Sequence, residues 1–285
     1  MTKESTTILL NIPNKHGDKL NSTLRYPKEP GKRLPVVIFC HGFKGFKDWG
    51  CFPYILESFA ESGFYSLGFN FSYNGTGPNH ETEQEFTRLE LFEKNTISRE
   101  LDDLKSIIDY IENNEDIYNY DVNKICLIGH SRGGADVIIT ASEDKRIKKL
   151  ITLAAVDKLN YFSERILAEW KEKGFTEFEN TRTKQMMRMS YDYVLDLEKN
   201  KDRFDLIEAI KKIKIPTLII HGTEDLSVKY SAAENLYNAT DKKNTKLELY
   251  EGTGHTFGSE HPFKRTFTVL ENVIYNIVNF LQKDF

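Results

Sequence analysis

Short apolar runs alternate with amphipathic stretches along most of the chain. The apolar runs have the length and continuity of strands buried on both faces of a sheet, and the stretches between them carry apolar residues at helical spacing. The predicted strands are Leu34–Cys40, Phe64–Phe71, Lys124–Gly129, Lys149–Val156, Pro216–His221 and Leu247–Glu251. The predicted helices are Phe52–Ser62, Thr96–Glu112, a run that starts after Gly134, Ser231–Thr240 and Arg265–Leu281. This alternation predicts an α/β fold, with a mostly parallel central sheet and helices on both faces.

The N-terminal part of the chain has a different pattern. Thr6–Ile12 and Lys19–Tyr26 alternate between apolar and polar residues, and the turn-forming residues Asn14–Asp18 separate them. Alternation of this kind is typical of strands that have one exposed face. These residues therefore predict an antiparallel hairpin at one edge of the sheet.

One long segment interrupts the alternation of strands and helices. Residues 158–214 are irregular in pattern, aromatic and charged, and the segment is far longer than the usual loop of an α/β unit. We interpret 158–214 as an inserted cap, and 1–157 together with 215–285 as the core domain. Every methionine after Met1 lies in this segment, beside many aromatic residues. Such side chains suit an adaptable pocket wall, and they equally suit a small core of the cap itself.

The size and charge of the chain narrow the classes of function. With 285 residues, of which 39% are hydrophobic, the chain can bury one large core and carry an insertion. Its 39 basic and 43 acidic residues give a net charge of −4 and form no basic block. This distribution argues against nucleic acid as a partner.

The cysteines and the apolar stretches give further expectations. Cys40, Cys51 and Cys126 are an odd number, and two of them lie in apolar runs, so we expect buried free thiols. No C-x-x-C or H-x-x-x-H spacing indicates a metal site, and we expect neither a metal nor a cofactor. The N-terminal residues lack an apolar leader, and no stretch approaches the roughly 20 apolar residues of a membrane helix. We therefore expect a cytoplasmic protein without a membrane span.

The most informative motif is Gly129-His130-Ser131-Arg132-Gly133, which ends a predicted strand and precedes a predicted helix. The pattern G-x-S-x-G describes a sharp turn in which the serine has a strained backbone and the two glycines avoid collisions. The turn exposes the serine hydroxyl and directs the N-terminus of the next helix at the reacting group. Ser131 is therefore a candidate nucleophile.

A serine nucleophile requires a base that takes its proton and an acid that orients this base. His255 follows a strand in a glycine-rich loop, so it is the candidate base. Asp225 follows a buried strand and is the favoured acid, and Asp157, at the end of the preceding strand, is its main competitor. The order of serine, acid and histidine, each placed after a strand, supports this selection.

The remaining histidines fall into two groups. Three of them abut strand ends, where packing and an orienting role are both open: His41, His130 and His221. Three others lie in polar loops, where exposure to solvent is the ordinary expectation: His16, His80 and His261.

Together these residues make the chain similar to members of the α/β-hydrolase superfamily. The similarity rests on four elements in chain order: His41–Gly42, Gly129–Gly133, His221–Asp225 with Val228 following, and Gly254–His255. It implies an α/β-hydrolase fold with Ser131 as nucleophile, His255 as general base and then acid, and Asp225 as orienting acid. It also implies an oxyanion hole formed by the backbone N–H groups of Phe43 and Arg132.

Within the superfamily, the His41–Gly45 loop and the cap resemble those of bacterial cinnamoyl/feruloyl-type esterases. They are also similar to those of dienelactone-hydrolase-like and prolyl-oligopeptidase-like hydrolases. One departure is Asn70, because relatives often have Asp at the start of this loop. This change is expected to affect the bracing of the loop more than the chemistry.

The resemblance implies a serine esterase that cleaves small carboxylic esters, with an aromatic or a short acyl group, through an acyl-enzyme intermediate. A peptidase or acyl-peptide hydrolase with the same triad is the alternative enzyme. A non-catalytic binding protein with this fold is a third reading, because a fold alone does not secure a function. The expected partner is a small-molecule ester. A homodimer is also open, because capped hydrolases often dimerise.

Overall fold

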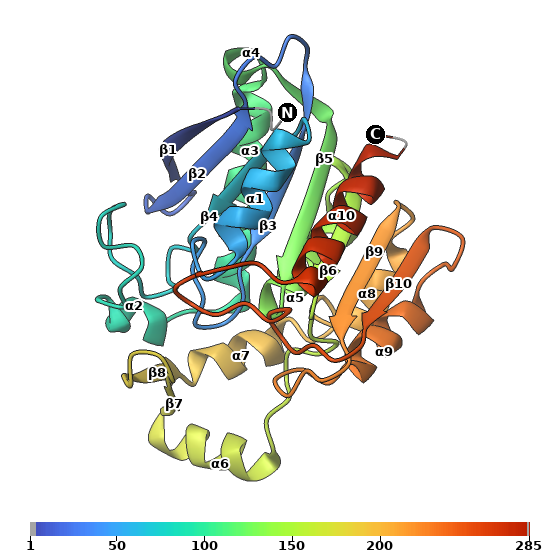
Figure 1. The fold of residues 1–285 in the computed structure, drawn as a ribbon. Coiled ribbons are helices and arrows are strands. Elements are labelled where there is room, and N and C mark those ends of the chain that lie inside the picture. Colours follow the sequence, from blue (N-terminus) through green and yellow to red (C-terminus); the bar gives the residue numbers. More distant parts are fainter. Residues whose placement is uncertain (1–3, 284) are drawn as a thin grey trace.

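The computed structural model describes residues 4–283 and 285, so residues 1–3 and 284 of the predicted core lie outside the described part. The strands of the main sheet are β1 (Ser5–Pro13), β2 (Lys19–Pro27), β3 (Leu34–Cys40), β4 (Tyr65–Phe69), β5 (Tyr120–His130), β6 (Ile147–Leu153), β9 (Thr217–Gly222) and β10 (Thr245–Tyr250). Within the described residues they lie in the order β1-β2-β4-β3-β5-β6-β9-β10 (Figure 1). β1 and β2 form the predicted antiparallel hairpin at one edge, and β2 also pairs antiparallel with β4. The other neighbouring strands pair in parallel.

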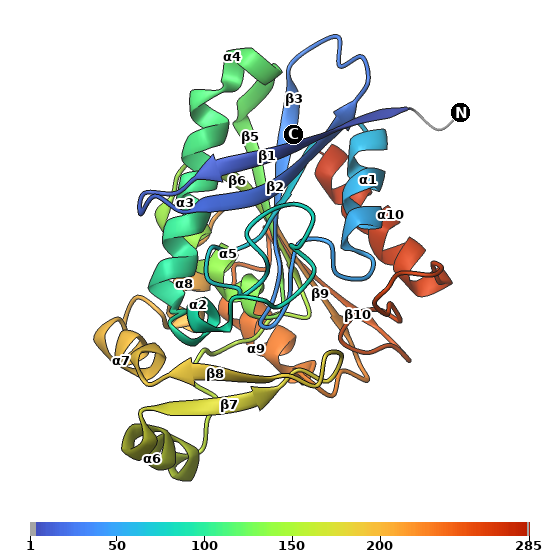
Figure 2. The ribbon, with the colours of Figure 1, turned by 90° about the vertical axis from the view of Figure 1, so that its left-hand side faces the viewer.

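Helices cover both faces of this sheet. They are α1 (Phe52–Glu61), α3 (Ile97–Asn113), α5 (Arg132–Glu143), α8 (Leu206–Lys212), α9 (Ser231–Ala239) and α10 (Thr268–Gln282). In Figure 2, α1 and α10 lie on the opposite side of the sheet from α3 and α5. The buried side chains of α1 and α10 belong to one cluster, and those of α3, α5, α8 and α9 belong to the other. The prediction of a mostly parallel sheet between two layers of helices is confirmed.

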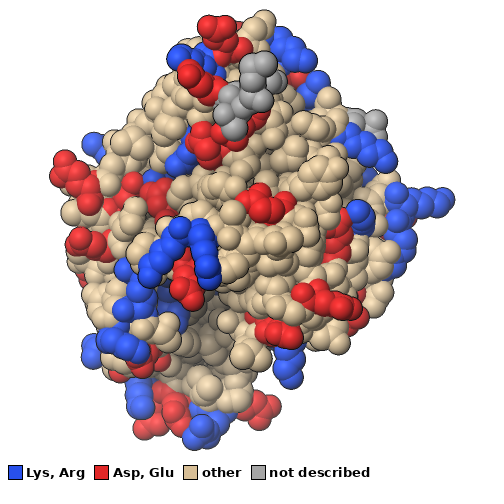
Figure 3. Space-filling view, in the orientation of Figure 1, with Lys and Arg blue, Asp and Glu red and all other residues tan. Residues whose placement is uncertain are grey.

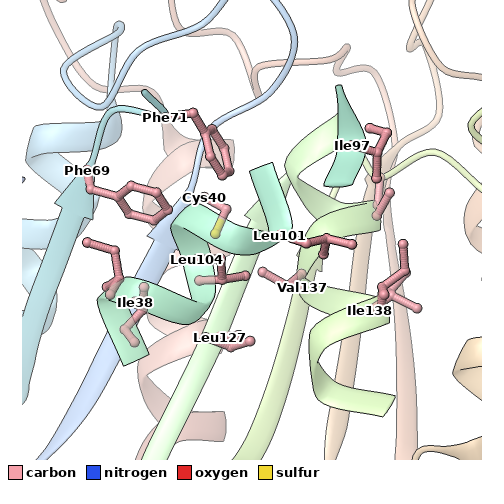
Figure 4. Packing of buried hydrophobic residues seen from close by; sticks show 14 of the residues in the cluster. Ile38, Cys40, Phe69, Phe71, Ile97, Leu101, Leu104, Leu127, Val137 and Ile138 are labelled. Atoms are coloured by element: carbon pink, nitrogen blue, oxygen red, sulfur yellow. The ribbon is translucent and has the colours of Figure 1, made fainter. Parts of the chain in front are cut away.

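Strand β3 shows how the sheet separates two hydrophobic cores. Val36, Ile38 and Cys40 belong to one cluster of buried side chains, whereas Val37 and Phe39 belong to the other. Successive side chains of a strand point to opposite faces, so a strand covered on both faces requires a continuous apolar run. Figure 4 shows the first cluster, in which side chains from β3, β4 and β5 pack against those from α3 and α5.

The boundaries of some elements differ from the prediction. α5 begins at Arg132 rather than after Gly134, because the positive φ of Ser131 (57°) turns the chain from strand to helix within one residue. The short helices α2 (Leu89–Glu93) and α4 (Glu115–Tyr118) are absent from the prediction. A helix of about one turn leaves no periodic pattern in the sequence.

Residues 158–214 form a helical segment and a hairpin outside the main sheet, followed by α8. The elements outside the sheet are α6 (Glu164–Lys173), β7 (Phe175–Glu179), β8 (Met186–Ser190) and α7 (Asp192–Lys199). They lie beyond the carboxyl ends of the parallel strands (Figure 1), whereas α8 packs against α5 and α9. The role of this segment as a cap stays a prediction.

Two of the three methionines of this segment and its tryptophan are buried, whereas Met186 is exposed. Trp170, Met187 and Met189 are at most 1% exposed, and they belong to the same cluster as the core strands. The indole N–H of Trp170 donates to the carbonyl oxygen of Met189 over 2.9 Å. For these three residues, the structure favours core packing over a pocket wall.

Other expectations concern thiols, membrane spans and charge. All three cysteines are buried free thiols, as predicted. No helix within residues 4–283 is long and apolar enough to cross a membrane. The described side chains also contain no cluster of His, Cys, Asp and Glu suited to a metal ion. On the face shown in Figure 3, acidic and basic side chains are interspersed.

Candidate active site

Ser131 occupies the turn between β5 and α5. Its backbone has φ 57° and ψ −121°, a conformation that costs a non-glycine residue about 1–3 kcal/mol. A Cβ atom on Gly129 would lie 2.2 Å from the carbonyl oxygen of Gly133, and one on Gly133 would lie 2.5 Å from that of Cys40. Close backbone approach therefore requires both glycines. A strained serine held by such contacts has the geometry of an exposed nucleophile.

His255 and Asp225 are in direct contact. Nδ1 of His255 lies 2.7 Å from Oδ2 of Asp225 and donates a hydrogen bond to it, since a carboxylate only accepts. The other oxygen of Asp225 accepts the backbone N–H groups of Ser227 (2.8 Å) and Val228 (2.9 Å). Asp157, the competing acid, instead accepts the side-chain amide of Asn235. Of the two candidate acids, only Asp225 contacts His255.

A second histidine contacts the same carboxylate oxygen. Nε2 of His221 lies 3.1 Å from Oδ2 of Asp225 and 2.8 Å from the carbonyl oxygen of Val228. Both atoms are acceptors, so Nε2 carries the proton and shares it between them. Burial of Asp225 opposes its ionisation, yet the hydrogen bonds from His221 and His255 hold its pKa well below the usual range. Asp225 is therefore an anion at neutral pH, as an orienting acid must be.

His130 supports His255 from the other side. Its Nε2 lies 2.9 Å from the carbonyl oxygen of His255, and the two ring centroids are 4.7 Å apart. Burial, followed by the positive charge that His255 can carry, lowers the pKa of His130 to about 3. His130 thus stays neutral and places no second cation beside His255. Both histidines therefore contact residues of the predicted triad, and an orienting role for them stays a prediction.

The variant His130→Gln should lose less stability on acidification than the wild type. Gln can keep the donor to His255 but does not titrate. The folded-state pKa of His130 lies below the unfolded value of about 6.5, so only the unfolded state gains a proton as the pH falls through 6.5. Between about pH 8 and pH 5 this linkage removes about 2 kcal/mol from the wild type alone. Urea denaturation of both proteins at the two pH values measures it, and equal losses would contradict a buried neutral imidazole.

Ser131 and His255 together line two cavities of about 350 and 600 Å³. Phe43, Lys44 and Ser227 line both of them. Aromatic and basic side chains complete the smaller cavity, among them Trp49, Phe52, Arg182 and His261. Polar, basic and aromatic side chains complete the larger one, among them Asp157, Lys158, Tyr161 and Lys229. The serine and the histidine therefore border both cavities.

The backbone N–H groups of Phe43 and Arg132 lie on two segments that meet at Ser131. Phe43 is part of a turn closed by the 3.0 Å hydrogen bond from Gly45 N–H to the carbonyl oxygen of Gly42. A Cβ atom on Gly42 would lie 2.8 Å from Cβ of Ser131, so this turn passes directly against the serine. Arg132 is the first residue of α5, where an amide has no acceptor in its own helix. Among the described residues neither amide donates to a protein group, and their role as an oxyanion hole stays a prediction.

The expectation that His261 is a solvated surface residue is wrong. Its Nδ1 accepts the backbone N–H of Gly50 over 3.0 Å, and its ring stacks on Trp49 and lines the smaller cavity. The sequence carries no signal for this packing, because the partners lie far from His261 along the chain. From residues 158–214, the cavities are reached by Lys158, Tyr161 and the hairpin residues Asn180–Arg182.

Two protein-family models match the chain. The model of the dienelactone hydrolase family matches residues 20–154 and 202–283, and the BD-FAE model matches residues 88–240. A putative esterase/lipase 2 of Mycoplasma genitalium is 26% identical over 252 residues, which cover 80% of this chain and 85% of that protein. Two Escherichia coli proteins align at 32% identity over 133 residues, so that the match spans 41% of the length of each.

Solved structures with the same fold cover nearly the whole chain. The α/β hydrolase GrgF from Penicillium sp. sh18 has a TM-score of 0.72 and 16% identity, covering 98% of both chains. Est1E from Butyrivibrio proteoclasticus, solved with ferulic acid bound, has a TM-score of 0.68 and 22% identity, covering 96% of this chain and 97% of Est1E. Similarity at this level of identity shows the fold, and it confirms the α/β-hydrolase fold that the sequence predicts.

Proposed function

This chain belongs to the dienelactone hydrolase family, and from this premise we propose that it is a serine esterase acting on small carboxylic esters. The observation that carries the proposal is the 2.7 Å hydrogen bond from His255 to Asp225 at cavities that also expose the strained Ser131. A base oriented by a buried carboxylate, beside a serine on a strand-to-helix turn, is the arrangement that activates a hydroxyl. The esterase or lipase name of the Mycoplasma relative supports the same class.

The mechanism follows from these positions. His255 takes the proton of Ser131 as Oγ bonds to the acyl carbon, and the carbonyl electron pair moves onto its oxygen. The N–H groups of Phe43 and Arg132 bind this oxyanion, and one such donor is worth about 2.7–4 kcal/mol. Collapse expels the alkoxide, which takes the proton from His255 and leaves as an alcohol. Water then repeats the sequence on the acyl-enzyme and releases the carboxylic acid.

We propose an aromatic acyl group as the preferred substrate part. Phe43, Trp49 and Phe52 line the cavity of about 350 Å³ that opens at Ser131, and flat rings pack well against such side chains. Est1E, which has the same fold, was solved with ferulic acid bound. These two observations favour a feruloyl-type group over a short aliphatic acyl group.

We further propose that residues 158–214 act as a cap over this site. Three hydrogen bonds join the β7–β8 region to loops of the core: Lys44 to the carbonyl of Glu179 (2.9 Å), Arg182 to that of Gln84 (3.1 Å) and Gln185 to that of Phe86 (3.0 Å). The dienelactone hydrolase model also leaves residues 155–201 unmatched. This segment is therefore not part of the core that the family shares.

Labelling with a fluorophosphonate probe tests the proposal. We expect rapid modification of the wild type, located on Ser131 by peptide mass spectrometry, and turnover of a panel of esters with feruloyl above acetyl. A matched p-nitroanilide separates an esterase from a peptidase, since an amine leaving group needs stronger protonation. Absence of labelling and turnover in the folded protein would refute the activity, and preference for the anilide would favour the peptidase alternative.

A further inference from the structure

The side chain of Arg132 is buried beneath the Phe43 turn. Arg132 is 5% exposed, and its Nη2 lies 2.5 Å from Oε1 of Glu100 on α3, which is 2% exposed. The side-chain amide of Asn95 donates to the same oxygen over 2.8 Å. Burial disfavours the guanidinium cation, but the carboxylate of Glu100 holds its pKa above the usual value. Arg132 is therefore a fixed cation directly after the candidate nucleophile.

The guanidinium group also contacts an aromatic ring. Its central carbon lies 4.5 Å from the ring centroid of Phe43 and 5.9 Å from that of Tyr193 on α7. A planar cation over an aromatic face is an attractive contact, and it strengthens when water is excluded. Arg132 therefore links the helix that follows Ser131 to the turn that carries Phe43.

Two further rings hold Phe43 in place. The ring of Phe92 on α2 lies 5.4 Å away, and that of Phe178 on β7 lies 5.2 Å away in an edge-to-face arrangement. By contrast, the backbone here belongs to no helix or strand, and Lys44 has a positive φ of 56°. The orientation of the Phe43 amide therefore depends on the contacts of its side chain more than on a regular ladder of hydrogen bonds.

From this arrangement we infer that Arg132 is a positioning residue whose side chain, by holding the ring of Phe43, sets the geometry between the two oxyanion-hole amides. The inference rests on the proposed function, because it assigns those amides to the oxyanion. An oxyanion hole is effective only when its donors are fixed before the charge develops. Here one residue supplies the first donor through its backbone and fixes the second through its side chain.

The ion pair with Glu100 does not by itself explain why residue 132 is an arginine. Oε2 of Glu100 and both carboxylate oxygens of the buried Asp136 have no hydrogen-bond partner among the described residues. Burial and the neighbouring Glu100 raise the pKa of Asp136 well above its usual value. A buried ion pair beside a carboxyl group with unpaired oxygens is a costly way to fill a core, and apolar side chains often replace buried ion pairs without loss of stability. A role at the active site explains why an arginine occupies this position.

The variants Phe43→Leu and Arg132→Lys separate positioning from packing. Phe43→Leu removes the ring, and Arg132→Lys keeps the charge for Glu100 but lacks the planar group over Phe43. For both we expect kcat for an aryl ester to fall about 10- to 100-fold with KM within about threefold, since misplacing one donor costs less than the 10²–10³ of removing it. The affinity for an aryl trifluoromethyl ketone, which forms the oxyanion, should fall by the same factor as kcat/KM.

Thermal melting and two additional variants distinguish a loss of positioning from a loss of folding. Arg132→Met combined with Glu100→Gln leaves no unpaired charge, and it should show the same loss of kcat. Arg99→Met breaks a more exposed ion pair, to Asp18, and neither residue lines the cavities; it should lower the melting temperature and leave kcat unchanged. If folded Phe43→Leu and Arg132→Lys kept the wild-type kcat and ketone affinity, the inference about Arg132 would be wrong. Turnover by the wild type would in that case still support the proposed esterase activity. An inactive wild type would overturn both.

Discussion

Ser131→Ala is expected to lower kcat for an aryl ester about 10⁴- to 10⁶-fold and to abolish labelling by a fluorophosphonate. Alanine keeps the Cβ atom and the backbone of the turn, and it removes only the Oγ atom that forms the acyl-enzyme. In serine hydrolases with this triad, loss of the nucleophile leaves only the contributions of binding and of the oxyanion hole. Initial rates with an ester of the preferred acyl group, at enzyme concentrations high enough to detect the residual rate, measure the effect.

Ser142→Ala provides the matched control. It makes the same substitution on α5, where the hydroxyl of Ser142 donates to the carbonyl oxygen of Ile139, and its kcat should equal that of the wild type. If Ser131→Ala kept more than about one hundredth of the wild-type kcat, Ser131 would not be the nucleophile. The proposed acyl-enzyme mechanism would then be wrong even though the fold is correct.

A glycine at position 131 tests whether the backbone of the turn is strained. Ser131→Gly should be as inactive as Ser131→Ala but about 1 kcal/mol more stable, because glycine adopts a positive φ without a steric cost. The gain stays small since glycine loses more backbone entropy on folding. Chemical denaturation of the two variants measures the difference, and a less stable glycine variant would show that the turn is not strained.

Much of the fold and of the site was predictable because parallel strands bring their carboxyl ends to one edge of the sheet. Ser131 and Asp225 follow apolar runs that form β5 and β9, and His255 follows the run that forms β10. The contact between His255 and Asp225 follows from this topology together with the order of residues along the chain. Asp157, which the sequence left open as a competitor, accepts the side-chain amide of Asn235, and the contact of His255 is with Asp225.

Other features depend on contacts that the sequence does not encode locally. From the sequence, Met187 and Trp170 suit a pocket wall and a core equally well. Their burial depends on the elements that pack over them in the structure. The partner of the Arg132 side chain is on α3, far from the G-x-S-x-G motif, and no spacing rule connects the two. In the sequence His130 and His221 are both histidines at strand ends, yet one contacts the backbone of His255 and the other contacts Asp225.

Asp225→Asn is expected to lower kcat about 10³- to 10⁴-fold with little change in KM. The amide nitrogen of Asn can donate to Nδ1 of His255, which then places the ring proton on Nε2, the atom that must accept the proton of Ser131. The neutral side chain also no longer stabilises the imidazolium that forms during both steps. Steady-state rates across a pH series measure the loss, and a fall of less than about tenfold would mean that another group orients His255.

His221→Phe removes the second donor from Asp225 and tests whether His221 is needed to place the acid. The hydrogen bond between His255 and Asp225 and the two backbone amides on the other oxygen all remain in this variant, so we expect kcat to fall no more than about tenfold. Loss of this donor should raise the pKa of Asp225, but the donors that remain on both of its oxygens keep it an anion at neutral pH. A loss as large as that of Asp225→Asn would instead assign the orientation of the acid mainly to His221. Comparison of kcat for the two variants at neutral pH therefore separates an acid fixed by its own turn from an acid held by a second histidine.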